Sequence, residues 1–221
     1  MEKNEPVSKP KILFVVNLPP PLHGASLMNE FALKSALLNT NFTISVINLT
    51  TAKNIDDLGS FSLTKVFFSL GKAFHILMEM LFFRPQLVYF TLAPVGFAFY
   101  RDAFFILLIK LFRKKIVFHL HGKGIEKSLK SNKIYATLAK MVFRNNFVIC
   151  LAEKLTFDIS NLVHTSKIFI VNNGVASTAE VTFTEKNQEF INILYLSNYV
   201  KSKGILDLID AVAIISHQKK N

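Results

Sequence analysis

Short apolar runs alternate along the chain with longer stretches in which apolar residues recur every three or four positions. Near-continuous runs of β-branched and aromatic residues are typical of strands buried on both faces of a parallel sheet. Six such runs predict strands at residues 11–17, 42–49, 86–91, 115–121, 146–151 and 167–173. Recurrence every three or four positions places apolar residues on one side of a helix. It predicts helices at residues 24–39, 61–83, 97–113, 131–144 and 153–163.

This alternation predicts both the fold class and the extent of the main domain. Strands joined by helices form α/β folds, here a doubly wound, Rossmann-like parallel sheet with right-handed crossovers. Ligands of such sheets bind beyond the carboxyl ends of the strands. We expect this domain to cover residues 11–178, after a polar tail at residues 1–10.

A second, smaller unit is predicted near the end of the chain. The polar stretch 179–190 is expected to be a linker, followed by a new strand at 191–198 and a helix at about 203–217. One strand and one helix cannot bury their own apolar faces. Residues 191–221 are therefore expected to be the start of an incomplete, second Rossmann-like domain.

Composition and charge narrow the classes of function. The chain has 221 residues, 51% of them hydrophobic, and one Cys, which argues against a disordered tail, a disulfide scaffold and a cysteine-rich zinc site. Its net charge of +11 favours an anionic partner. Charged residues such as Lys72 and Glu79 interrupt the most apolar stretch, 61–83, so we do not expect a membrane span. The N-terminal apolar run after Lys11 ends at Pro19 without a small-residue cleavage pattern, so we do not expect a secretory signal. A cytoplasmic location is the expectation.

The positive charge is concentrated in one segment. Eleven Lys or Arg residues and two acidic ones fall between Arg101 and Cys150. Phe residues are interleaved with them, and we single out four, Phe104, Phe105, Phe112 and Phe143. The segment could be a solvated face, but basic and aromatic residues together favour an anionic membrane surface. Nucleic acid is not expected as a partner, because no recognised binding module accompanies the charge.

The first predicted strand leads into a loop that contains Pro and Gly and then into a helix. Free backbone N–H groups at a helix start bind anions, and Gly24 allows a ligand to approach closely. Gly24, Ala25 and Ser26 are therefore candidates for contact with a phosphate or an acceptor. The alternative is an ordinary turn in which Ser26 caps the helix. A dinucleotide site is disfavoured, because the chain has no GxGxxG motif and no acid after its second strand to hold a ribose.

Two histidines, His119 and His121, lie two residues apart and hence on the same side of the fourth predicted strand. His121 is expected at the carboxyl tip, where it could act as a general base or hold a hydroxyl or phosphate. Gly122 and Gly124 would keep the backbone open beside it. The alternative is a histidine that is satisfied by a backbone carbonyl. No third ligand accompanies the His-x-His pair, so no metal site is predicted.

In the second unit, Lys203 and Gly204 stand at the start of the predicted helix. An ammonium beside free backbone N–H groups makes a cradle for a pyrophosphate. The alternative is an ordinary exposed lysine followed by a glycine at the start of a helix.

Five strings, in this order along the chain, resemble the family 4 glycosyltransferases, which are retaining enzymes of the two-domain GT-B fold. They are PPPLHGAS (19–26), HLHG (119–122), ICLAEKLTFDI (149–159), VNNGV (171–175) and LYLSNYVKSKG (194–204). The resemblance implies transfer of a sugar from a nucleotide-sugar donor, UDP- or GDP-linked, to a hydroxyl of a glycan or lipid-linked acceptor. It implies no metal or other cofactor.

The resemblance also implies roles for single residues. His121 matches the strand-end histidine that lines the acceptor and sugar site and is the catalytic candidate. In the family, the loop that corresponds to the one around Gly24 lies at the interdomain cleft, near the donor phosphates and the acceptor. Lys203 matches the lysine that binds the donor pyrophosphate, with Gly204 beside it. Asn198 stands where many members have Arg.

The rest of the family's donor-binding half, including its E-x7-E element, does not occur in the sequence. We therefore expect little or no transferase activity unless a separate C-terminal half completes the chain. The expected setting is cell-surface polysaccharide, lipopolysaccharide or glycolipid assembly, with the protein held peripherally at the inner face of the membrane. The alternative is a split or decayed transferase domain that only binds a membrane surface or a partner.

Overall fold

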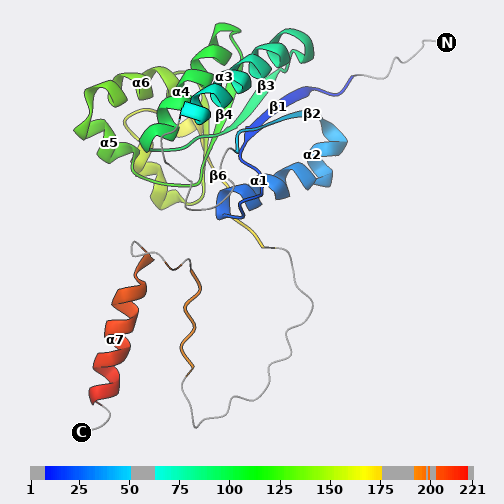
Figure 1. The fold of residues 1–221 in the computed structure, drawn as a ribbon. Coiled ribbons are helices and arrows are strands. Elements are labelled where there is room, and N and C mark those ends of the chain that lie inside the picture. The colour runs from blue at the N-terminus through cyan, green and yellow to red at the C-terminus, as the bar shows by residue number, and fades with distance from the viewer. Residues whose placement is uncertain (1–7, 51–62, 176–191, 198, 200–202, 219–221) are drawn as a thin grey trace, which may run out of the picture. The chain divides into compact units, whose positions relative to one another are not determined.

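The computed structural model describes residues 8–50, 63–175, 192–197, 199 and 203–218. The chain divides into two compact units, Met1–Val175 and Ala176–Asn221. The first unit holds a six-stranded, all-parallel sheet with helices on both faces, which confirms the α/β, Rossmann-like class (Figure 1). The predicted boundary at residue 178 and the predicted linker lie outside the described residues.

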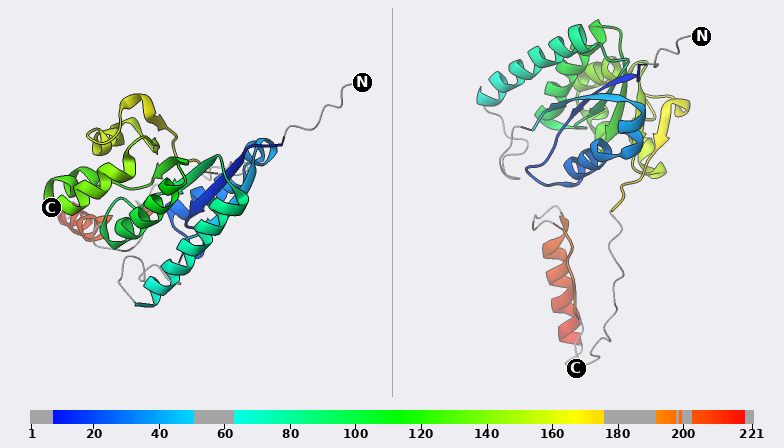
Figure 2. Two further views of the ribbon diagram at one scale, coloured as in Figure 1. Left: turned by 90° about the horizontal axis from the view of Figure 1, so that it is seen from above. Right: turned by 90° about the vertical axis from the view of Figure 1, so that its right-hand side faces the viewer.

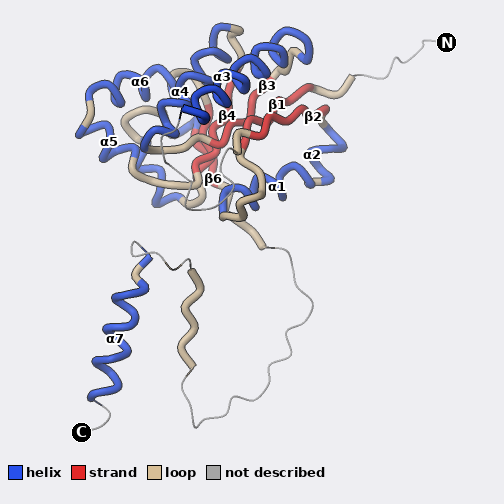
Figure 3. Tube along the Cα trace, in the orientation of Figure 1, coloured by secondary structure: helices blue, strands red, loops and turns tan. Residues whose placement is uncertain are grey.

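All six strands predicted for the first unit are confirmed, each somewhat shorter than predicted. They are β1 (Lys11–Val16), β2 (Thr43–Asn48), β3 (Leu87–Thr91), β4 (Lys115–Leu120), β5 (Phe147–Cys150) and β6 (Ile168–Ile170). Their order in the sheet is β2-β1-β3-β4-β5-β6, and every neighbouring pair is parallel (Figure 3). Central parallel strands are covered on both faces, which explains the near-continuous apolar runs.

The first predicted helix, 24–39, is two helices in the structure. Helix α1 (Gly24–Lys34) ends at Ser35, and helix α2 (Ala36–Asn41) begins there. The Ser35 hydroxyl accepts a hydrogen bond from the backbone N–H of Leu38 at 3.4 Å. Serine competes in this way with the helical backbone ladder, so Ser35 caps α2 instead of continuing α1.

Three further helices agree with the predictions. Helix α3 (Leu63–Met78) continues directly into a π-helical turn, η2 (Glu79–Phe83). Helix α4 (Gly96–Leu111) and helix α6 (Lys133–Phe143) match the segments predicted at 97–113 and 131–144. Helix α6 begins later than predicted, because the Asn132 side chain accepts a hydrogen bond from the N–H of Tyr135 at 3.0 Å and caps it.

Two segments differ from the predictions for one shared reason. Helix α5 (Ile125–Ser131) was not predicted, because the carboxylate that caps its start belongs to Asp158, far along the chain. The helix predicted at 153–163 is wrong. That segment forms a 3-10 helix, η3 (Glu153–Ile159), followed by turns and a second 3-10 turn, η4 (Thr165–Lys167). No side chain caps the start of η3, and its Asp158 bonds to α5 instead.

In the second unit, the predicted helix is confirmed as α7 (Ile205–Gln218). The predicted strand at 191–198 is wrong over its described part, because residues 192–197 form no strand. A strand needs a neighbour to satisfy its backbone N–H and C=O groups, and the described residues of this unit provide none. Leu194 and Leu196 stay exposed as a result.

Two apolar clusters stabilise the first unit, one on each face of the sheet. The larger lies between the sheet and helices α3, α4 and α6, and it includes Phe90, Phe118, Phe143 and Cys150. The smaller brings Ile12 and other β1 side chains against α1 and α2. Figures 1 and 2 show these two helical layers, with α1 and α2 on one face and α3, α4 and α6 on the other.

Candidate functional site

The order of the strands places a topological switch point between β1 and β3. The sheet grows from β1 to β2 in one direction and from β1 to β3 and β4 in the other. The connections after β1 and β3 therefore lie on opposite faces, and ligands of doubly wound sheets bind between them. The loop after β4, residues 121–124, lies next to this point because β4 adjoins β3.

His119 and His121 lie at this edge with their rings close together and tilted. The ring centroids are 4.0 Å apart, and the rings are inclined by 40°. Nδ1 of His119 forms a hydrogen bond with the hydroxyl of Tyr89 on β3. Nε2 of His119 and both ring nitrogens of His121 are buried without a hydrogen-bond partner among the described residues. Buried polar groups are rarely left unsatisfied, so these three nitrogens mark a place where a polar ligand group fits.

Burial keeps the rings at this edge neutral. It lowers the pKa of His119 to about 4, and together with the neighbouring His119 and His23 it lowers the pKa of His121 to about 3. Burial also lowers the pKa of His23. A neutral imidazole offers one donor and one acceptor, which suits a hydroxyl group, whereas it carries no charge to bind a phosphate. A pKa near 3 also makes His121 a weak general base at neutral pH.

The loop between β1 and α1 comes close to this edge, since His23 influences the pKa of His121. His23 caps α1 by accepting a hydrogen bond from the N–H of Ser26 at Nδ1, at 3.3 Å. The buried Ser26 hydroxyl accepts from the N–H of His23 at 3.0 Å and donates to the carbonyl of Pro21. Ser26 therefore takes part in the capping box of α1, in agreement with the alternative interpretation. No atom lies within 4 Å of a methyl group built on Gly24, so the fold itself does not demand glycine there.

Gly122 has a packing role in this structure. A methyl group at this position would come within 3.0 Å of the Pro94 ring, so glycine lets the loop after β4 lie against the loop after β3. The loop after β3 is itself fixed from two sides. The hydroxyl of Tyr135 donates to the carbonyl of Pro94 at 2.6 Å, and the buried Asp102 carboxylate accepts from the N–H of Ala93 at 2.9 Å. These contacts fix the loop after β3 beside the loop that contains His121.

Three further polar residues lie at this edge and were not predicted from the sequence, namely Asn29, Tyr89 and Thr91. The side chain of Asn29 on α1 donates to the carbonyl of Asn17 at 2.9 Å and accepts from the hydroxyl of Thr91 at 2.8 Å. This chain of bonds ties α1 to the ends of β1 and β3. Tyr89 lies inside an apolar run, where nothing in the sequence marks it as a partner of His119.

The residues predicted in the second unit are described here by themselves. Asn198 lies outside the described residues. Lys203 is exposed, and its carbonyl accepts a hydrogen bond from the Tyr195 hydroxyl at 3.0 Å. Gly204 has a φ of 80°, a conformation that favours glycine, immediately before α7. Ala25 is half-buried in the first turn of α1.

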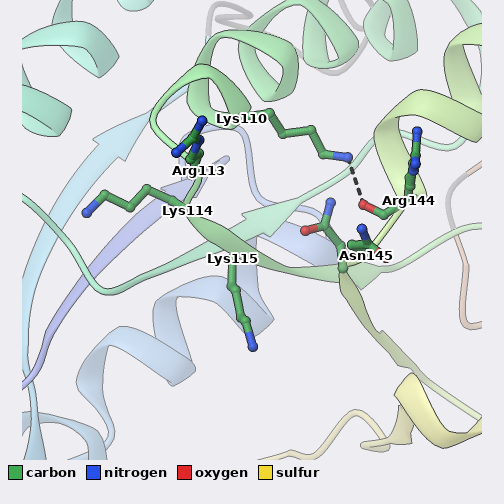
Figure 4. Close-up of a pocket in the computed structure, with 7 residues that line it drawn as sticks. Lys110, Arg113, Lys114, Lys115, Arg144 and Asn145 are labelled. Atoms are coloured by element: carbon green, nitrogen blue, oxygen red, sulfur yellow. Dashed lines mark hydrogen bonds between the residues drawn. The ribbon is translucent and has the colours of Figure 1, made fainter.

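Part of the basic segment lies at the opposite, amino edge of the sheet. A pocket of about 350 Å³ is lined there by Lys110, Arg113, Lys114, Lys115, Arg144, Asn145 and Asn146. The Lys110 ammonium donates to the carbonyl of Arg144 at 2.9 Å and so caps the end of α6. Burial, followed by the charge of Arg144, lowers the pKa of Lys110 to about 8. Figure 4 shows Lys114 and Lys115 pointing away from Lys110, so these cations do not converge on one ligand.

The structure corrects one expectation about this segment. Phe105 and Phe143, which were expected to face a membrane together with the lysines, are buried in the core, and Phe112 is half-buried. Of the four interleaved Phe residues, Phe104 is exposed. The rings follow the helical spacing of α4 and α6 into the core, and the basic side chains occupy the outer positions.

The described residues contain no group of three or more His, Cys, Asp or Glu side chains that could hold a metal ion. No protein-family model matches the chain, and a comparison with curated proteins finds no significant match.

Acidification from pH 7 to pH 5 is expected to lower the free energy of unfolding by about 2 kcal/mol for each of His119 and His121. Both pKa values, about 4 and about 3, lie below that of an unfolded histidine, so the unfolded chain binds protons first as the pH falls. Stability is therefore retained above about pH 6.5 and lost progressively below it. Urea unfolding at the two pH values measures the loss.

A double variant identifies the source of this loss. Replacing His119 and His121 by Gln removes the two titrating rings, and the difference between pH 7 and pH 5 should shrink by at least half. Replacing the exposed His164 by Gln is the matched control and should leave the difference unchanged. An undiminished difference in the double variant would assign the acid sensitivity to other groups.

Proposed function

We propose that the chain is a glycosyltransferase chain that holds a sugar hydroxyl against His121 at the carboxyl edge of its first unit. One observation carries the proposal. Both ring nitrogens of His121 are buried and lack a partner among the described residues, beside the switch point of a doubly wound sheet. The neutral ring can donate one hydrogen bond and accept another, which is the pairing that a hydroxyl offers.

The proposed reaction moves a sugar from a UDP- or GDP-linked donor to a hydroxyl of a glycan or lipid-linked acceptor. His121 holds a hydroxyl of the transferred sugar, beside the packed loops of Gly122 and Pro94. The leaving diphosphate needs positive charge, which neutral histidines do not supply. Within the first unit, the proposed source of that charge is the set of backbone N–H groups at the start of α1, around Gly24.

Binding of nucleotide sugars tests the proposal directly. With UDP-glucose and GDP-mannose as probes, saturation-transfer NMR of the 221-residue chain is expected to show contact with one of them. Replacing His121 by Ala should weaken binding at least tenfold, or about 1.4 kcal/mol, which is comparable to the loss of one or two buried hydrogen bonds. Replacing the exposed His164 by Ala should leave the affinity unchanged. Equal affinity of the His121 variant and the parent chain would remove His121 from the site.

A second function, a module that binds a sugar without transferring it, is favoured by one specific observation. The pKa of His121, lowered to about 3, leaves the ring a weak base for activating an acceptor hydroxyl. Transfer of radiolabelled sugar to a glycolipid fraction separates the two functions. When a separate C-terminal half is supplied, transfer that disappears in the His121 variant supports the enzyme, and binding without transfer supports the module.

A further inference from the structure

Helix α3 and the turn η2 bury very little of their surface for so apolar a segment. By length and composition alone, Val66–Phe83 could cross a membrane, yet only 17% of it is buried. The buried side chains form one narrow row, Ala73, Ile76 and Met80, at spacings of three and four. A core helix of a soluble domain buries most of an apolar surface of this length.

The position of α3 explains why so much of it is exposed. Among the described elements, α4 is its helical neighbour on one side, and the sheet lies beneath it. Figure 2 shows α3 at the outer border of its helical layer. The sides that face neither the sheet nor α4 carry the outer apolar stripe, defined as Phe67, Leu70, Phe74, Leu81 and Phe82. Phe67, Phe74 and Phe82 are 74%, 63% and 77% exposed, respectively.

The polar residues of the same helix form a third row. This row consists of Lys72, His75 and Glu79, again at spacings of three and four. It lies between the buried row and the outer apolar stripe. Glu79 lies 3.6 Å from His75, and its side chain is 18% exposed. The carboxylate is therefore largely removed from the exposed surface, and the other charged side chain of this row, Lys72, is positive.

Cations lie on aromatic rings at the borders of the outer apolar stripe. The ammonium of Lys72 lies 4.9 Å from the centre of the Phe68 ring, and that of Lys11 lies 5.3 Å from the centre of the Phe83 ring. Arg84 follows η2 directly and is exposed. Lysine stems that run along apolar surface with the charge at its edge are typical of helices at a membrane interface.

We infer that α3 and η2 lie in the plane of an anionic bilayer surface, with the outer apolar stripe among the acyl chains and Lys11, Lys72 and Arg84 against the headgroups. Charge complementarity favours an anionic lipid surface as the occupant. An apolar stripe bordered by positive charge, on a chain with a net charge of +11, matches a surface that is apolar within and negative at its boundary. This surface is separate from the site of His121, so the inference does not depend on the proposed sugar binding.

A tryptophan introduced into the stripe tests the inference, because the chain has no Trp of its own. The Phe74→Trp variant is mixed with vesicles of phosphatidylcholine and phosphatidylglycerol, or of phosphatidylcholine alone. We expect a blue shift of its emission and quenching by brominated acyl chains with the anionic vesicles, both reversed by high salt. The matched control is Leu37→Trp, at a 73% exposed position of α2 on the other face of the sheet, whose emission should not change.

Removing the stripe gives a second, independent measurement. The Phe67→Ser/Phe74→Ser double variant should bind anionic vesicles at least tenfold more weakly in a flotation assay, and Leu37→Ser should bind like the parent chain. Equal binding of the double variant, or equal shifts of both Trp variants, would overturn the inference. A blue shift of Phe74→Trp that grows with protein concentration without vesicles would assign the stripe to contact between copies. Binding that resists high salt and alkaline extraction would instead show a membrane span.

Discussion

Replacing Phe118 by Ala is expected to lower the free energy of unfolding by about 4 kcal/mol. Phe118 is fully buried in the middle of β4. Its ring centre lies 5.2 Å from that of Phe143 on α6 and 6.4 Å from that of Phe90 on β3. The variant loses the burial of the ring and leaves a cavity at the point where the sheet and the helical layer meet, and close-packed neighbours collapse into such a cavity only in part.

Urea unfolding followed by circular dichroism measures this loss. Phe82→Ala is the control, because its ring is exposed on η2 and its removal should change the free energy of unfolding by less than about 0.5 kcal/mol. Phe118→Leu, which fills most of the volume, should cost about 1 kcal/mol. Equal losses for the two alanine variants would contradict the central position assigned to Phe118.

Replacing Asp158 by Ala is expected to lower the free energy of unfolding by about 3 kcal/mol. The Asp158 carboxylate accepts hydrogen bonds from three successive N–H groups at the start of α5, those of Gly124, Ile125 and Glu126, at 2.8 to 3.0 Å. The residue is 5% exposed, so water does not readily replace it. The variant leaves buried donors unsatisfied at the positive end of a helix dipole.

The matched control for this variant is Glu153→Ala in the same 3-10 helix. Glu153 is exposed, and its removal should change the free energy of unfolding by less than about 0.5 kcal/mol. Asp158→Asn keeps one oxygen acceptor without the charge and should lie between the two. Amide hydrogen exchange adds a local measurement, in which residues 124–126 should lose protection in the alanine variant. Unchanged exchange there would mean that α5 does not depend on the carboxylate.

The two kinds of element were predictable from the sequence to different degrees. Strands such as β4 were found because burial on both faces leaves a run of apolar residues that has no other simple explanation. Helix α5 was missed because its cap comes from Asp158, which follows β5 and reaches α5 because β5 pairs with β4. The strand predicted at 191–198 is wrong over its described part, although its apolar pattern is typical of a strand. A strand also needs a neighbour to pair with, and the described residues of this unit provide none. Apolar patterns in the sequence therefore indicated candidate elements, whereas contacts with residues far along the chain determined which of these elements formed.

The candidate site was predictable in position and less so in chemistry. The tip of β4 follows from the strand prediction, and His121 lies in the loop that leaves it, as expected. The neutral state of His121 depends on burial and on His119 and His23, which no spacing in the sequence reveals. In the folded chain Ser26 also takes part in the capping box of α1, and Gly122 packs against Pro94. Residue type suggested what these positions could do, and their neighbours determined what they do in the folded chain.

The burial of Cys150 has a practical consequence for thiol chemistry. It is the single cysteine of the chain, it is buried at the end of β5, and burial together with the nearby Asp158 raises the pKa of its thiol. The thiolate is the species that reacts with maleimides, so Cys150 stays largely unlabelled at neutral pH while the first unit is folded. A cysteine placed at exposed Leu37 would carry a label in the folded chain, and labelling of Cys150 would itself report unfolding of the larger cluster.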